Sequence, residues 1–129
     1  MTKLVLAIDD KDHALKQILH EFPEIPKNDY VFRHFDSIAA FRESGIDSAF
    51  AVFLDFFLSK DRDYGTTLIP ELRCNHLVCF SSKKQMSDHM MSAALDQEHA
   101  NVGHVYSVQK IKGSIENAEL AETLRSIFC

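Results

Sequence analysis

The sequence predicts an α/β fold in which a five-stranded parallel sheet is covered by helices on both faces. Apolar strand-like runs alternate with helix-like segments over short connections, which is the pattern of successive β-then-α units. The run 50–54 is continuously apolar, as expected for a strand that is buried on both faces. A chain of 129 residues is long enough to bury roughly two thirds of its unfolded surface. One domain with a substantial core is therefore expected.

Local signals predict the individual elements. Apolar residues recur at helical spacing over 13–22 until Pro23 ends the pattern. Asp36 or Ser37 can cap a short second helix, and Gly45 can end it. The five strands are expected at 3–8, 30–35, 50–54, 77–80 and 104–108.

The later helices carry equally local signals. Thr67 can cap a third helix that contains Leu68, Ile69 and Leu72, and Pro70 is tolerated there only in the first turn. A fourth helix is expected around 85–95. Ser114 is expected to cap a last helix whose apolar residues are Ile115, Leu120, Leu124 and Ile127.

Composition excludes several classes of function. The net charge is −5 and no run is rich in Lys or Arg, which argues against a nucleic-acid surface. No apolar run approaches the roughly 20 residues needed to cross a bilayer. The start, MTKLVLAIDD, ends in two acids rather than at a cleavage site, so it reads as a strand and not as a signal peptide. Three cysteines without metal-ligand spacing indicate reduced thiols, and a cytoplasmic location is predicted.

Polar side chains suited to a shared site follow the first, third, fourth and fifth predicted strands. In a parallel sheet the carboxyl ends of the strands meet at one edge, and ligands bind there at the switch point in strand order. The sequence therefore predicts that three carboxylates, hydroxyls and an amine gather at this edge. These strand-end residues are Asp9 and Asp10, Asp55, Ser81 and Ser82, and Gln109 and Lys110.

Three acids at one edge repel one another unless a cation lies between them. Hard oxygen ligands of this kind suit Mg²⁺, which takes one or two carboxylates and keeps several waters. A lysine and a hydroxyl beside that ion can hold the oxygens of a phosphoryl group. We therefore predict that Asp55 is a metal-neutralised carboxylate placed to accept phosphate.

The order of these residues resembles the response-regulator receiver domain of two-component signalling. The matching stretches are LVLAIDD, AVFLDFFL, LVCFSS and VYSVQK, and the pattern of strands and helices around them spans residues 4 to 128. The resemblance implies a flavodoxin-like, doubly wound, five-stranded parallel sheet with helices on both faces. It also implies one receiver domain over 1–129 with no output domain.

The resemblance assigns a role to each strand-end acid. Asp55 accepts a phosphoryl group from a phosphohistidine on a sensor histidine kinase or a phosphotransfer protein. Asp10 binds Mg²⁺ directly, together with Asp55 and the backbone carbonyl of Phe57. Asp9 holds a metal-bound water.

Two further side chains then contact the phosphoryl group. Ser81 donates a hydrogen bond to it, Lys110 pairs with another of its oxygens, and the small Ser82 leaves room. The chemistry is limited to self-phosphorylation and autodephosphorylation, so no other enzyme activity is expected. Phosphorylation then shifts a two-state equilibrium that remodels the face near the fifth strand for a downstream protein. Receivers can also form homodimers through the last strand and helices.

Several positions depart from the family pattern. Ser59 stands near the place of the usual proline, and Gly65 lies farther from Asp55 than usual. Asp61 and Asp63 in the lengthened loop are expected to be solvated charges rather than extra metal ligands. Ile111 follows Lys110, where the family has a proline that allows a cis bond.

The spacing at the fifth strand leaves an alternative open. Tyr106 lies at the customary distance from Gln109 and not from Lys110. Either the strand carries an extra residue, or Gln109 takes the place of the family lysine. In the second case the chain is a degenerate receiver, acting as a phosphorylation-independent protein-interaction module.

Two other classes of protein have a comparable loop after the first strand and are alternatives to a receiver. Asp10-x-Asp12 after an apolar strand resembles haloacid-dehalogenase-type phosphatases, with Asp10 as nucleophile and Asp12 as general acid. Ala14 replaces the usual threonine of that motif, and Asp55 would have no role. A flavodoxin-like cofactor binder needs hydroxyls and glycines in the first loop, where this chain has acids.

Overall fold

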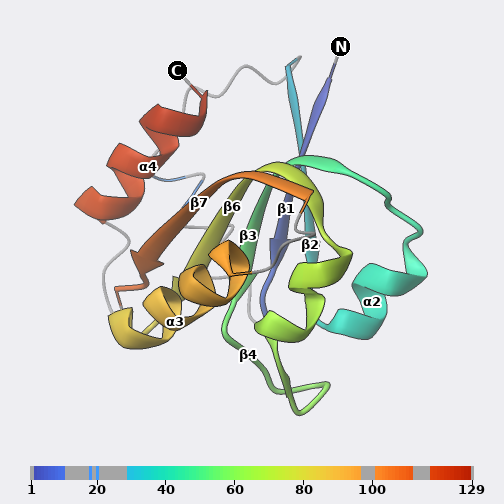
Figure 1. Cartoon of the computed structure of the whole chain (residues 1–129). Coiled ribbons are helices and arrows are strands. Elements are labelled where there is room, and N and C mark those ends of the chain that lie inside the picture. The colour runs from blue at the N-terminus through green and yellow to red at the C-terminus, as the bar shows by residue number, and fades with distance from the viewer. Residues whose placement is uncertain are drawn as a thin grey trace.

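The computed structural model describes residues 2–10, 18, 20, 29–96, 101–111 and 117–128. Five strands form one parallel sheet in the order β2-β1-β3-β6-β7 (Figure 1). The predicted fold class is confirmed. The strands are β1 (Lys3–Ile8), β2 (Tyr30–Phe35), β3 (Ala49–Asp55), β6 (Arg73–Ser81) and β7 (Asn101–Gln109).

Helices cover both faces of this sheet, and each face has its own apolar core. One core joins the sheet to α2 (Ile38–Glu43), to the 3-10 helix η1 (Gly65–Glu71) and to α3 (Lys84–Leu95). The other core contains three residues of α4 (Ala118–Phe128) and the helical residue Ile18. Because side chains alternate between the faces of a strand, the central strands β1, β3 and β6 supply both cores.

The capping signals of the second helix act as predicted. The Ser37 side chain accepts a hydrogen bond from the Ala40 N–H at 3.0 Å, which satisfies an N–H group that the first turn leaves unpaired. Gly45 has φ of 69° just after the helix, a conformation that glycine adopts without a steric penalty.

The predicted third helix is wrong in type and in its cap. Residues Gly65–Glu71 form a 3-10 helix that begins before Thr67, and the Thr67 hydroxyl donates to Asp63 rather than capping. Pro70 stands near the end of the helix and not in its first turn. The helix can end there because Leu72 is already extended and leads into β6.

Parts of the first and last helix predictions lie outside the described residues. Of the segment 13–22, the structure describes Ile18 and His20, and both are helical. Ser114 and Ile115 also fall outside. At the described start of α4, the Asn117 side chain accepts a hydrogen bond from the Leu120 N–H at 3.1 Å. Among the described helices, none has the length and apolar character that spanning a membrane requires.

The thiols of the two described cysteines are free and buried. Cys74 and Cys79 both lie in β6 and contact the core on the α3 side of the sheet. Burial raises the pKa of each thiol to about 12. Since the thiolate is the reactive form, these cysteines behave as small apolar core residues.

Candidate functional site

Asp9, Asp10 and Asp55 come together where β1 and β3 end. The two strands are neighbours in the middle of the sheet, and the strand order reverses between them, so the acids lie at the switch point. One carboxylate oxygen from each acid lies within 4.8 Å of the others. These oxygens are placed so that they could hold a metal ion.

Asp9 is the most buried of the three acids, with an exposed fraction of 1%. Its Oδ2 lies 2.5 Å from the Lys110 Nζ. The backbone of Asp9 is also fixed, since its N–H donates to the Phe35 carbonyl at 3.0 Å and its carbonyl contacts the His34 Nε2 at 2.7 Å. The salt bridge to Lys110 offsets the cost of burying this charge.

Asp55 ends β3 with a side chain that is 12% exposed. Its Oδ1 accepts a hydrogen bond from the Phe56 N–H at 2.9 Å and lies 3.0 Å from the Lys110 Nζ. Within the described part of the chain, its Oδ2 accepts no hydrogen bond. Burial raises the pKa of Asp55 to about 6; the charge of Lys110 opposes the rise, and those of Asp9 and Asp10 add to it. The site therefore holds Asp55 as a carboxylate at neutral pH, at an energetic cost.

Asp10 is oriented from the loop that follows β3. The Ser59 hydroxyl donates to the Asp10 Oδ2 at 2.7 Å. Partial burial raises the pKa of Asp10, but the hydrogen bond from Ser59 and the charge of Lys110 outweigh it and hold the pKa below its ordinary value. Asp10 therefore stays ionised to a lower pH than Asp55.

The structure places Lys110, and not Gln109, against the acids. The Lys110 Nζ contacts both Asp9 and Asp55, whereas the Gln109 Nε2 donates to the Ser82 carbonyl at 3.1 Å. The Lys110 N–H donates to the Ser81 carbonyl at 2.7 Å, so the chain leaves β7 beside the end of β6. The described peptide bonds, which include the one to Ile111, are all trans.

Neither interpretation of the spacing between Tyr106 and Lys110 fits the structure, because Lys110 itself contacts the acids and β7 has no extra residue. The register between β6 and β7 is regular from Arg73 to Ser81, with no extra residue in the strand. Tyr106 instead packs against the α4-side core, and its hydroxyl lies 3.0 Å from the His76 Nδ1. Ser107 stands three residues before Lys110, and its hydroxyl is bound to α3.

Two predicted site residues remain less closely tied to the acids. Ser81 is buried at the end of β6, where its hydroxyl accepts a hydrogen bond from the Lys83 N–H at 3.3 Å. Phe57 follows Asp55 by two residues; the residue is 48% exposed, and its ring lies beside that of Tyr64. The phosphate contact of Ser81 and the metal contact of the Phe57 carbonyl stay predictions.

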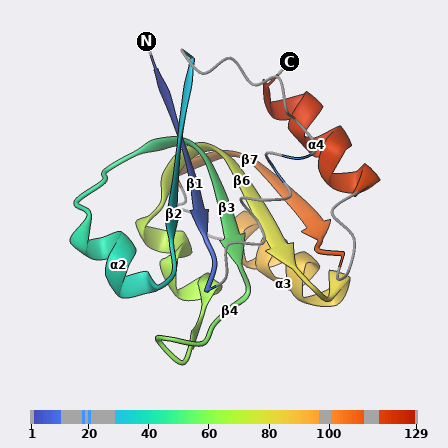
Figure 2. The ribbon, with the colours of Figure 1, turned by 180° about the vertical axis from the view of Figure 1, so that it is seen from behind.

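A hairpin that the sequence did not predict forms one wall of the site. It consists of β4 (Phe57–Leu58) and β5 (Asp63–Tyr64), and it lies beyond the edge toward which the strands of the sheet point (Figure 2). The Gly65 N–H closes it by donating to the Phe56 carbonyl at 2.6 Å. A Cβ at Gly65 would collide with the Asp55 backbone carbonyl, so only glycine fits at this approach.

Side chains of the hairpin loop bind elements on the other side of the site. Ser59 holds Asp10, and Lys60 forms a salt bridge with Asp36. Asp61 accepts hydrogen bonds from the N–H groups of Ile38 at 2.6 Å and Ala39 at 3.4 Å, at the start of α2. The expectation that Asp61 is a solvated charge is therefore wrong, because its carboxylate satisfies the first amides of a helix.

We expect Asp61→Ala to destabilise the protein by about 1 kcal/mol, the usual effect of losing a helix cap. The change removes the acceptor for two helix N–H groups without touching the acid cluster. Urea unfolding followed by circular dichroism measures the loss. Asp47→Ala is the matched control because Asp47 is an exposed aspartate outside the caps and ion pairs of the described residues. Equal stability of the two variants would contradict the capping role.

Comparisons with known proteins address the fold. No protein-family model matches the sequence, and no curated protein matches it. Among solved structures, the BeF3-activated DrrB receiver domain is 16% identical, with 97% of each chain covered and a TM-score of 0.57. A response regulator from Thermotoga maritima is 13% identical over 99% of this chain and 98% of its own, also with a TM-score of 0.57. The Mn²⁺-bound response regulator Rcp1 is 12% identical over 97% and 91%, with a TM-score of 0.62.

The chain has the receiver-domain fold. Similarity to solved structures at identities of 12% to 16% shows the fold but not the function. The receiver fold places Asp9, Asp10, Asp55 and Lys110 together from the ends of three strands, as the strand-end pattern predicted. The contacts of Lys60 and Asp61 gave no signal in the sequence. For Ser59, the departure from the family proline was the one hint.

Proposed function

We propose that this chain is a response-regulator receiver that accepts a phosphoryl group on Asp55. The donor is a phosphohistidine of a sensor histidine kinase or of a phosphotransfer protein. The observation that carries the proposal is the grouping of Asp55 with two further acids and with the Lys110 Nζ at 3.0 Å, at the switch point of a receiver fold. Each group has a use in phosphoryl transfer, which depends mainly on positioning and charge.

In the proposed transfer the Asp55 Oδ2 is the nucleophile. It forms the new O–P bond while the P–N bond of the phosphohistidine breaks, and the electron pair of that bond stays on the imidazole nitrogen, which takes up a proton. The Lys110 ammonium, already beside Asp55, pairs with an oxygen of the transferred group. Ser81 at the end of β6 donates a hydrogen bond to another oxygen.

The donor set fits Mg²⁺ as a cofactor. Three carboxylates with oxygens within 4.8 Å of one another offer hard ligands, and Lys110 alone cannot neutralise three negative charges. In the proposal Asp10, Asp55 and the Phe57 carbonyl hold the ion, and Asp9 holds one of its waters. The bound ion supplies positive charge that offsets the acids and the phosphoryl oxygens. The similar Rcp1 structure is described as Mn²⁺-bound.

The test is phosphorylation by a small-molecule donor. Incubation with acetyl phosphate and Mg²⁺ should increase the mass of the intact protein by one phosphoryl group. Asp55→Asn should abolish the increase, whereas Asp96→Asn, at the exposed end of α3, should leave it unchanged. No increase in the wild type would favour the phosphorylation-independent interaction module, and an equal increase in Asp55→Asn would show that Asp55 is not the acceptor.

The phosphatase alternative is weaker than the receiver proposal. In a haloacid-dehalogenase-type enzyme Asp55 has no role, yet here it shares the acid cluster and a lysine. Asp12, the general acid of that alternative, lies outside the described residues. Asp12→Asn distinguishes the two, because a phosphatase loses turnover whereas a receiver still accepts the phosphoryl group.

A further inference from the structure

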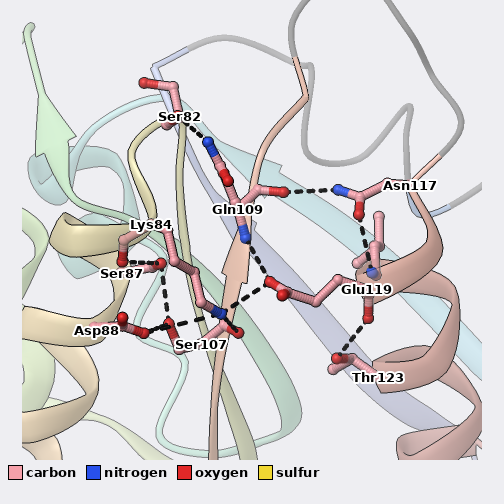
Figure 3. A network of polar contacts seen from close by, with 10 residues as sticks. Ser82, Lys84, Ser87, Asp88, Ser107, Gln109, Asn117, Glu119 and Thr123 are labelled. Atoms are coloured by element: carbon pink, nitrogen blue, oxygen red, sulfur yellow. Dashed lines mark hydrogen bonds and ion pairs between the residues drawn. The ribbon is translucent and has the colours of Figure 1, made fainter.

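Helix α4 binds the residue that precedes the site lysine (Figure 3). The Gln109 N–H donates to the Glu119 Oε1 at 2.9 Å, and the Gln109 carbonyl accepts a hydrogen bond from the Asn117 Nδ2 at 2.7 Å. The Gln109 side chain is also engaged, since it donates to the Ser82 carbonyl. The backbone just before Lys110 is therefore fixed by two side chains from the start of one helix.

Asn117 links this contact to the formation of α4. Its side chain is 2% exposed, and its Oδ1 accepts a hydrogen bond from the Leu120 N–H at 3.1 Å. The amide is thus oriented by the helix that it caps, with its oxygen toward α4 and its nitrogen toward β7. Asn117 can reach the Gln109 carbonyl in this orientation only when α4 is docked against the sheet.

Glu119 connects the same contact to α3. Its Oε1 also accepts a hydrogen bond from the Lys84 Nζ at 2.9 Å. Lys84 in turn donates to the Ser107 carbonyl at 2.6 Å, two residues before Gln109. The Ser107 hydroxyl donates to the Asp88 carboxylate at 2.5 Å (Figure 3). The last residues of β7 are therefore bound to both flanking helices.

These contacts hold the backbone directly before the side chain that faces the acids. Successive side chains of a strand point to opposite sides, so a one-residue change at the end of β7 would present Gln109 to Asp55 in place of Lys110. We propose that Glu119 and Asn117 are positioning residues that direct Lys110 toward Asp55. The inference rests on the proposed function, in which Lys110 pairs with the phosphoryl group.

The coupling between α4 and the site works in both directions. If docking of α4 places Lys110, then a ligand that binds Lys110 favours the docked helix by the same factor. Substituting Glu119 should therefore change the affinity for a ligand that binds at the acid cluster. Within the described structure, Glu119 contacts none of the three acids of that cluster.

The first measurement is the affinity for beryllofluoride with Mg²⁺, a mimic of the phosphoryl group. We expect Glu119→Ala to weaken it about tenfold, within the usual range of coupling between two sites. Glu122→Ala, which removes the same side chain one turn later on the exposed side of α4, should change it less than twofold. Glu119→Gln keeps the acceptor oxygen and should restore most of the affinity. Equal affinities for Glu119→Ala and Glu122→Ala would overturn the proposal.

A double-mutant cycle distinguishes positioning from general loss of structure. In a Lys110→Gln background, Glu119→Ala should weaken beryllofluoride binding no further, because the group that it positions is gone. A further tenfold loss in that background would overturn the proposal. If Glu119→Ala does not fold, Asn117→Ser takes its place, since serine keeps the helix cap but cannot reach the Gln109 carbonyl.

The second measurement needs no ligand. The Lys110 Nζ lies 5.4 Å from the centre of the Phe80 ring, so contacts between their protons should be visible by nuclear Overhauser spectroscopy. These contacts should be lost in Glu119→Ala and kept in Glu122→Ala. If the contacts between Lys110 and Phe80 are lost in Glu119→Ala but the wild type binds no beryllofluoride, the proposed function is refuted and the positioning role is supported. Retention of the contacts in Glu119→Ala would refute the positioning role alone.

Discussion

Lys110→Met is expected to destabilise the metal-free protein by about 3–5 kcal/mol at pH 7, the usual cost of breaking a buried ion pair by removing one partner. The Lys110 Nζ lies 2.5 Å from the Asp9 Oδ2 and 3.0 Å from the Asp55 Oδ1, and both carboxylates are nearly buried. Without the ammonium, two like charges remain in a low-dielectric site. Methionine keeps most of the apolar stem beside Phe80, so the change isolates the charge.

Urea unfolding in the presence of a chelator measures this loss. Lys83→Met is the matched control, since Lys83 is exposed and makes no ion pair within the described structure. The loss in Lys110→Met should shrink near pH 5, where Asp55, with its pKa of about 6, becomes protonated and leaves fewer unpaired charges. Added Mg²⁺ should also reduce it if the acids bind the ion. A loss below about 1 kcal/mol at pH 7 would show that the acids are compensated by other groups.

The sequence predicted the sheet and the acid cluster because both depend on local patterns. The strands β1 and β2 have the predicted bounds, and each is followed directly by an aspartate, Asp9 or Asp36. The acids at 9, 10 and 55 meet because parallel strands end at one edge. The choice between Gln109 and Lys110 could not be made in this way. It depends on how Glu119 and Asn117 of another element bind the backbone of β7.

The hairpin was missed for a similar reason. The strands β4 and β5 have two residues each, which is too short for an alternating pattern to appear. Asp61 looked like a solvated charge because its partners, the first amides of α2, lie more than 20 residues earlier in the chain. Short strands and long-range caps follow from tertiary contacts that a local pattern does not contain.

Asp55→Asn is expected to have the opposite effect to Lys110→Met. In the folded protein, burial raises the pKa of Asp55 from 3.8 to about 6. Between these two values the folded state binds more protons than the unfolded state, so the contribution of this group to the free energy of unfolding falls as pH rises. Above pH 6 the full cost of the buried charge is present, and the rise of the pKa from 3.8 to about 6 corresponds to a cost of up to about 3 kcal/mol. Asparagine removes that cost.

The decisive measurement is how the difference in the free energy of unfolding between Asp55→Asn and the wild type changes with pH. In metal-free buffer the variant should be up to about 3 kcal/mol more stable at pH 7, and its advantage should decline between pH 6 and pH 4 as Asp55 of the wild type becomes protonated. Asp96→Asn, an exposed aspartate, should show no such trend. Mg²⁺ should close this difference in stability at pH 7, because an ion that binds the folded wild type more tightly stabilises it more.

A variant that is less stable than the wild type at pH 7 without metal would mean that the contact with Lys110 outweighs burial. In that case Asp55 would be a structural partner of the lysine rather than a carboxylate held ready for a cation and a phosphoryl group.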